Sequence, residues 1–154
     1  MITLADAAAT RRAGAVLAKL VGGGDTIALI GDLGAGKTTL VGGLVEALGG
    51  VASSPTFSLV NEYPTPRFTV WHVDLYRIER EAELPELGLD DVIGNRRGIS
   101  LIEWADKFAV LPSDHLRLEL AHIKDARSLT ATGTGARGQV LASSLEGELL
   151  GSSS

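Results

Sequence analysis

The run Gly31-Asp-Leu-Gly-Ala-Gly-Lys-Thr38 constrains the fold of this chain more than any other feature. Glycine, four residues and then Gly-Lys-Thr form a loop whose backbone N–H groups converge on phosphate oxygens. The apolar run Thr26 to Ile30 precedes this loop, and a helical pattern from Thr38 to Leu48 follows it. We therefore expect an α/β, P-loop NTPase-like fold with a mostly parallel central sheet, flanking helices and antiparallel strands at the margin.

The loop also indicates its ligands. Lys37 is expected to reach the β- and γ-phosphates, and the Thr38 hydroxyl to ligate Mg²⁺. The helix that follows presents its positive end to the phosphates. The sequence thus predicts ATP and Mg²⁺ as cofactors. The alternative is a glycine-rich turn with an incidental lysine.

Two acidic residues complete the predicted site. Glu103 directly follows the apolar run Ile99 to Ile102, where a P-loop protein places a carboxylate for Mg²⁺. Without the loop, we would interpret this glutamate as a solvated surface residue. His72, Asp74 and Tyr76 alternate with apolar residues and so share one face of a strand. Asp74 is expected to orient the attacking water or to hold Mg²⁺ through water, and His72 to be a hydrogen-bonded structural imidazole.

Three further features have a less specific interpretation: one is structural, and each of the other two has two alternatives. Trp104 is interpreted as a packing residue. Arg77 is either an ion-pair partner or a phosphate contact. The hydroxyl-rich loop with Ser53, Ser54, Thr56 and Ser58 is either a segment ordered by the γ-phosphate or a proline-containing turn.

The remaining patterns favour a single P-loop ATPase domain over residues 1–135. A C-terminal tail, 136–154, is expected to hold a short helix that begins near Gln139 and frays. The other expected elements are a helix capped by Thr3 and Asp6 and ending at Gly22-Gly23-Gly24, a hairpin of Phe57–Tyr63 and Phe68–Leu75, one or two short helices in Glu79–Asp91, and an antiparallel pair of Leu116–Leu120 and Ser128–Thr132.

Composition excludes several classes of function. The chain has 154 residues and a net charge of −5, which argues against a basic surface for direct nucleic-acid binding. It has no cysteine, which excludes disulfides, thiolate zinc sites and cysteine nucleophiles. Neither an export signal nor a membrane-spanning stretch is evident, so the protein is expected to be cytoplasmic.

Several motifs together resemble one family. They are Gly31 to Thr39, Ser54-Pro-Thr-Phe-Ser-Leu-Val60, His72-Val-Asp-Leu-Tyr-Arg77, Glu86-Leu-Gly-Leu89 and Ile102-Glu-Trp104. In this order and spacing, over roughly residues 3 to 130, the chain resembles TsaE, the small ATPase of bacterial tRNA threonylcarbamoyladenosine synthesis. The set is more specific than the P-loop alone.

The resemblance implies roles for individual residues. Lys37, Asp74 and Glu103 are the implied catalytic residues, and Thr38 and Glu103 the implied Mg²⁺ ligands. Two positions, Asp106 and Arg127, fall where members place further nucleotide contacts, although Glu-Trp-Ala-Asp replaces the commoner Glu-Trp-Pro form. The implied nucleotide contacts are Leu33, Gly34, Ala35, Gly36, Lys37, Thr38, Thr39, Asp106 and Arg127.

The resemblance also implies an ATPase, weak alone and stimulated by partners, that resets or activates a complex of the TsaB and TsaD proteins. Contact with tRNA is then expected to be indirect, through those partners.

Other functions are alternatives to this one. A small-molecule kinase would use the same loop but needs an acceptor pocket and a lid. A GTPase is disfavoured because the Asn-Lys-x-Asp sequence that reads guanine is absent. An interaction module without turnover is disfavoured because Lys37, Thr38, Asp74 and Glu103 are all present.

Overall fold

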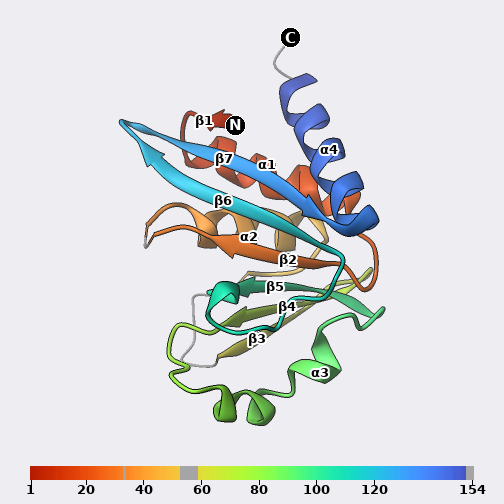
Figure 1. The fold of residues 1–154 in the computed structure, drawn as a ribbon. Coiled ribbons are helices and arrows are strands. Elements are labelled where there is room, and N and C mark those ends of the chain that lie inside the picture. Colours follow the sequence, from red (N-terminus) through yellow and green to blue (C-terminus); the bar gives the residue numbers. More distant parts are fainter. Residues whose placement is uncertain (33, 53–58, 152–154) are drawn as a thin grey trace.

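A mixed sheet runs through the middle of the protein (Figure 1). The computed structural model describes residues 1–32, 34–52 and 59–151, and in these the sheet has seven strands in the order β1-β7-β6-β2-β5-β4-β3. Strands β6, β2, β5 and β4 are parallel, whereas β1, β7 and β3 pair antiparallel with their neighbours. The predicted parallel centre with antiparallel margins is confirmed. The strands are β1 Ile2–Leu4, β2 Thr26–Ile30, β3 Val60–Pro64, β4 Thr69–Asp74, β5 Gly98–Glu103, β6 His115–Ile123 and β7 Ala126–Thr134.

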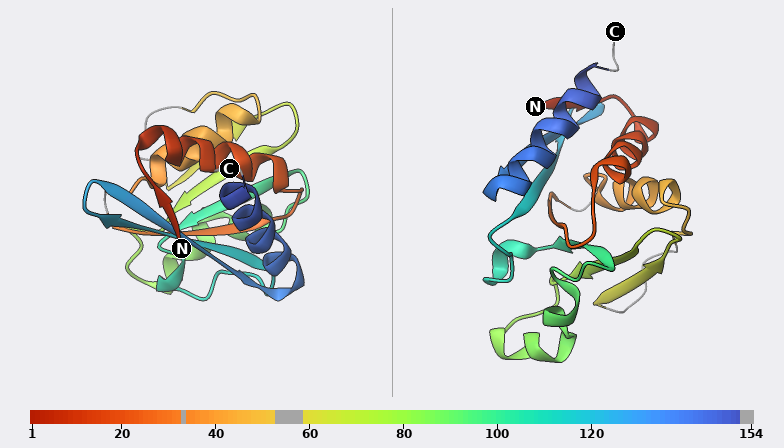
Figure 2. Two further views of the ribbon diagram at one scale, coloured as in Figure 1. Left: turned by 90° about the horizontal axis from the view of Figure 1, so that it is seen from above. Right: turned by 90° about the vertical axis from the view of Figure 1, so that its right-hand side faces the viewer.

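Helices cover both faces of this sheet (Figure 2). Alternate residues of a strand point to opposite faces. Ile27 and Leu29 of β2 therefore belong to a core shared with α1, α2 and α4, while Ala28 belongs to a smaller core with the segment around α3. The helices are α1 Ala7–Leu20, α2 Lys37–Ala47, the 3-10 helix η1 Glu81–Leu87, α3 Leu89–Val92, the 3-10 helix η2 Ala105–Lys107 and α4 Gly135–Gly151. None of the helices in the described ranges is long and apolar enough to cross a membrane.

The elements beside the glycine-rich loop form where the sequence predicts them. Strand β2 has the predicted bounds, and α2 begins and ends one residue earlier than expected. The hairpin of β3 and β4 is confirmed from Val60 onward. Residues 57 and 58 of the predicted strand lie outside the described residues. The glycine-rich loop therefore lies between a buried strand and the start of a helix, which is the position that phosphate binding requires.

The predicted start of the first helix is wrong. Thr3 lies in β1, opposite Ser128 of β7, and does not cap a helix. The cap is Asp6, whose carboxylate accepts a hydrogen bond from the Ala9 N–H at 2.8 Å. The local Thr-x-x-Asp pattern fits a capping box, but the pairing of β1 with β7 joins segments that are distant in the sequence. β1, and not the β6–β7 pair, is consequently the edge strand on this side of the sheet, and β3 is the edge strand on the other side.

The C-terminal helix is longer than predicted. α4 has 17 residues and buries Leu141, Ala142 and Leu145 in the larger core. Arg137 anchors its first turn, because its guanidinium donates to both carboxylate oxygens of Asp25 at 3.1 and 2.8 Å. The hydrogen bonds to Asp25 raise the pKa of Arg137. The burial of these three side chains and the Arg137–Asp25 ion pair together explain why the helix is longer than the short one that the local sequence pattern predicts.

Candidate functional site

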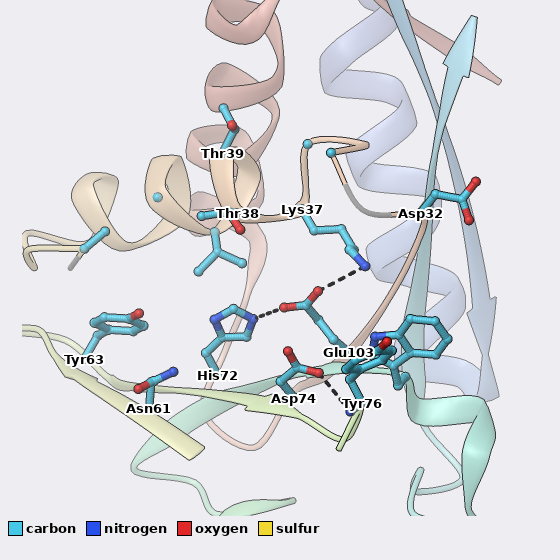
Figure 3. Close-up of a pocket in the computed structure, with 16 residues that line it drawn as sticks. Asp32, Lys37, Thr38, Thr39, Asn61, Tyr63, His72, Asp74, Tyr76 and Glu103 are labelled. Atoms are coloured by element: carbon cyan, nitrogen blue, oxygen red, sulfur yellow. Dashed lines mark hydrogen bonds and ion pairs between the residues drawn. The ribbon is translucent and has the colours of Figure 1, made fainter. Parts of the chain in front are cut away.

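A pocket of about 670 Å³ opens between the start of α2 and the carboxyl ends of β4 and β5 (Figure 3). Ligand sites of open parallel sheets form at this position, beyond the carboxyl ends of the strands. The predicted residues that the structure brings together there are Gly34, Gly36, Lys37, Thr38, Thr39, His72, Asp74, Tyr76, Glu103 and Trp104.

Two glycines shape the loop at the mouth of this pocket. Gly34 and Gly36 have φ angles of 82° and 109°, a region that side chains disfavour. Gly36 is the N-cap of α2, and a glycine has no side chain with which to occupy the N–H groups of the first turn. A Cβ at Gly36 would lie 3.3 Å from Cγ2 of Thr10. The start of α2 therefore offers backbone donors and positive dipole to an anion.

Lys37 and His72 bind the same carboxylate from two sides. Lys37 Nζ lies 3.2 Å from Oε1 of Glu103, and His72 Nε2 lies 2.6 Å from Oε2. Figure 3 shows Glu103 between the two side chains. The ammonium of Lys37 also donates to the carbonyl oxygen of Gly31 at 2.6 Å. The structure thus confirms a hydrogen-bonded imidazole at His72.

The ionisation of Glu103 follows from these contacts. Burial raises the pKa of Glu103, because a buried charge loses hydration. The hydrogen bond and charge of His72, followed by Lys37, act in the opposite direction and outweigh burial. The pKa of Glu103 therefore lies below its ordinary value, and the residue is a carboxylate at neutral pH.

Asp74 and Glu103 end neighbouring strands. They are direct partners in the parallel register of β4 and β5, so both side chains leave the same face of the sheet. The carboxylate of Asp74 accepts a hydrogen bond from the backbone N–H of Tyr76 at 3.0 Å. The predicted sharing of a face by His72, Asp74 and Tyr76 is confirmed, because all three line the pocket while Val73 is fully buried on the other side.

Trp104 is not the packing residue that the sequence favoured. Its side chain is 43 % exposed and its backbone has a φ of 61°. The ring lies 5.2 Å from the ring of Tyr76 and 5.7 Å from the ammonium of Lys37. These three side chains form one wall of the pocket.

Asp106 and Arg127, the two positions expected to make further nucleotide contacts, have different surroundings. Arg127 reaches the loop, where its guanidinium donates to the Gly34 carbonyl at 3.4 Å. Asp106 instead forms two hydrogen bonds of 2.8 Å with Arg117, and these lower the pKa of Asp106. Asp106 lines a second hollow of about 360 Å³, which shares Lys37 with the main pocket. An Asp106 contact to a ligand would compete with Arg117.

The sequence did not predict three polar residues that also line the pocket: Asp32, Asn61 and Tyr63. The hairpin gives the signal that finds two of them, since Asn61 lies opposite His72 and Tyr63, two residues later in β3, lies on the same face as Asn61. Ala35 of the loop is fully buried and packs in the larger core. Leu33 and the loop residues Ser53, Ser54, Thr56 and Ser58 lie outside the described residues.

The donor set suits a hard cation. The Thr38 hydroxyl and the carboxylates of Glu103, Asp74 and Asp32 all line the pocket. Oxygen donors are those that Mg²⁺ selects, and Mg²⁺ takes one or two carboxylates together with water and phosphate oxygens. In the described part of the chain, no three acidic or histidine side chains converge as a preformed metal cluster. The residues present therefore fit Mg²⁺ held jointly with a phosphate.

Comparison with known proteins gives one consistent result. The family model "Threonylcarbamoyl adenosine biosynthesis protein TsaE" matches residues 4–129. The tRNA threonylcarbamoyladenosine biosynthesis protein TsaE of Bacillus subtilis is 39% identical over 126 residues, which cover 79% of this chain and 78% of the relative. Its namesake from Nostoc is 40% identical over 126 residues, covering 79% and 77%. The crystal structure of Bacillus subtilis YdiB superposes with a TM-score of 0.77 at 30% identity, covering 93% of this chain and 90% of that one.

Proposed function

We propose that this chain, which belongs to the TsaE family of tRNA threonylcarbamoyladenosine biosynthesis, is a Mg²⁺-dependent P-loop ATPase of that machinery. The observation that best supports this proposal is that one pocket at the start of α2 is lined by Lys37, Thr38, Asp74 and Glu103. This arrangement supports phosphoryl transfer to water, which depends on positioning and on charge stabilisation.

The chain's own residues divide this work. The N-terminus of α2 and Lys37 bind the β- and γ-phosphates, with Lys37 exchanging Glu103 for phosphate oxygens. Thr38 and the released carboxylate of Glu103 would hold Mg²⁺. When bound, Mg²⁺ neutralises charge that develops on the phosphates. His72 keeps a hydrogen bond to the other oxygen of Glu103 and so fixes its orientation.

Asp74 has the position of the group that orients the attacking water. Its carboxylate is a register partner of Glu103 and already accepts one backbone hydrogen bond from Tyr76. A carboxylate retains further acceptor positions, so the same side chain can accept a hydrogen bond from water. Its role is orientation and proton acceptance.

The partners in this proposal are TsaB and TsaD. Turnover by the chain resets or activates their transferase complex, and tRNA is reached through that complex. The net charge of −5 supports indirect contact, since tight tRNA binding draws on basic side chains. Localisation in the cytoplasm, where tRNA is modified, is part of the proposal.

The test measures ATP hydrolysis by the chain alone and with a purified TsaB–TsaD pair. We expect weak release of inorganic phosphate alone, strong stimulation by the pair, and repeated formation of modified adenosine per complex. Phosphate transferred to a small metabolite would instead identify a kinase. Hydrolysis that the pair leaves unchanged would contradict the partner assignment.

A further inference from the structure

Lys107 uses all three donors of its ammonium group on one turn of the backbone. Its Nζ atom lies 2.6 Å from the carbonyl oxygen of Ile78, 2.9 Å from that of Tyr76 and 3.4 Å from that of Leu75. An ammonium has three donors and no acceptor, so these carbonyls satisfy it completely. Because the donor is charged, the two shorter bonds, to Ile78 and Tyr76, are stronger than bonds between neutral groups. This lysine therefore acts as a clamp on residues 75–78.

The chain after β5 places Lys107 at this turn. β5 ends at Glu103, and the left-handed backbone of Trp104 reverses the direction of the chain. Ala105 is then buried at 1 % exposure and anchors the start of η2. The Lys107 N–H closes the turn by donating to the Trp104 carbonyl at 3.1 Å. The side chain of Lys107 consequently reaches from the end of β5 to the segment that follows β4.

The clamped turn holds the residues at the end of β4. Within it, the Ile78 N–H donates to the Leu75 carbonyl, and the Tyr76 N–H donates to the carboxylate of Asp74. The Leu75 N–H donates to the Glu103 carbonyl at 3.1 Å. The turn is thus bonded to both carboxylate-bearing positions of the pocket. A shift of this turn would move Asp74 relative to Glu103.

We propose that Lys107 is a positioning residue that clamps the 75–78 turn and so sets the placement of Asp74 and Tyr76 opposite Glu103 for ATP hydrolysis, an inference that rests on the proposed function. Removal of the ammonium leaves the carbonyls of Tyr76 and Ile78 to water, and only the bond from the Ile78 N–H remains on the Leu75 carbonyl, so the turn is loosened. Catalysis is sensitive to such shifts, since a misplacement of about 1 Å costs up to about 100-fold in rate.

The kinetic test compares Lys107→Met with Lys107→Arg and with Lys19→Met as a matched control at an exposed lysine near the end of α1. We expect Lys107→Met to lower kcat about tenfold and to change KM for ATP by less than about twofold. Lys107→Arg keeps a charged donor and should recover at least about a third of the wild-type kcat. Lys19→Met should match wild type. A rise in KM at unchanged kcat, or equal kinetics in all variants, would overturn the positioning role.

A second measurement needs no activity. Hydrogen exchange of the amides of Leu75, Tyr76 and Ile78 should accelerate in Lys107→Met, while the amides of β2 keep wild-type rates and report an intact fold. Unchanged exchange in the turn overturns the clamp. If wild type hydrolyses no ATP with its partners, the proposed function fails, whereas accelerated exchange would still support a clamp on the turn.

Discussion

His72 Nε2 lies 2.6 Å from Oε2 of Glu103, a contact between two side chains that are about nine-tenths buried. The second oxygen of this carboxylate is bound to Lys37. Without a ligand, the carboxylate and the loop lysine therefore neutralise each other, and His72 keeps the carboxylate in place. In the proposed function, phosphate binding draws Lys37 toward the phosphates, which makes the carboxylate available to a cation when the nucleotide arrives.

Lys37→Met should weaken ATP binding by about 10–100-fold. Charged hydrogen bonds contribute about 1.5–3 kcal/mol, and the substitution removes those of the ammonium while it keeps the length of the side chain. Isothermal titration calorimetry measures the Kd, with Lys19→Met as the exposed control. Equal affinity of the two variants would place the phosphates elsewhere.

Glu103→Gln should lower Mg²⁺-dependent kcat by about 100-fold and leave Mg²⁺-free nucleotide affinity within about threefold. The amide keeps the volume but loses the charge that the cation needs, and a loss of about 2.7 kcal/mol corresponds to that factor. Phosphate-release assays over a Mg²⁺ series check this. Glu46→Gln, on the exposed side of α2, should behave as wild type.

Acid should destabilise the wild type more than Glu103→Gln. The folded pKa of Glu103 is lowered, so its contribution to stability is present above the ordinary glutamate value of about 4.3 and is lost as the pH falls through the folded pKa. The pKa values of Glu83 and Asp106 are lowered as well, and both proteins share their effect. Urea unfolding at neutral pH and near pH 3 gives the difference between the two proteins. A difference that is constant with pH contradicts the prediction.

Gly36→Ala should cost about 1–2 kcal/mol in unfolding free energy, because the φ of 109° disfavours a side chain. It should also weaken nucleotide binding by moving the first turn of α2. Gly147→Ala is the control, since a Cβ there meets nothing within 4 Å and the helix interior favours alanine by about 0.5–1 kcal/mol. Thermal unfolding should therefore shift in opposite directions for the two variants.

The sequence predicted which side chains gather at the pocket better than it predicted the elements around them. The strand, loop and helix from Thr26 onward depend on local pattern and turn chemistry, and the alternation from His72 to Tyr76 follows from strand geometry. The pairing of β1 with β7 and the bond between Asp106 and Arg117 join segments that no local pattern connects. Trp104 was misjudged because neither its left-handed backbone nor the exposure of its ring has a signature in residue type.

Arg137→Ala should destabilise the protein by about 1–2 kcal/mol without changing nucleotide affinity. Asp25 is buried and loses two charged hydrogen bonds, although part of the arginine side chain is in solvent and water screens the pair. The exposed neighbour Gln139→Ala serves as the control. Urea unfolding and calorimetry measure the two quantities, and a parallel loss of affinity would mean that α4 supports the pocket.

The register that places Asp74 beside Glu103 also decides which genetic changes the site tolerates. A single residue inserted into or deleted from β4 inverts every side chain beyond it, so that Asp74 would turn to the face occupied by Val73. Point substitutions at half-buried positions of the same strand, such as Thr69, leave the alternation intact. Variation in β4 is accordingly expected to occur by replacement of residues, with length changes confined to the connections on either side.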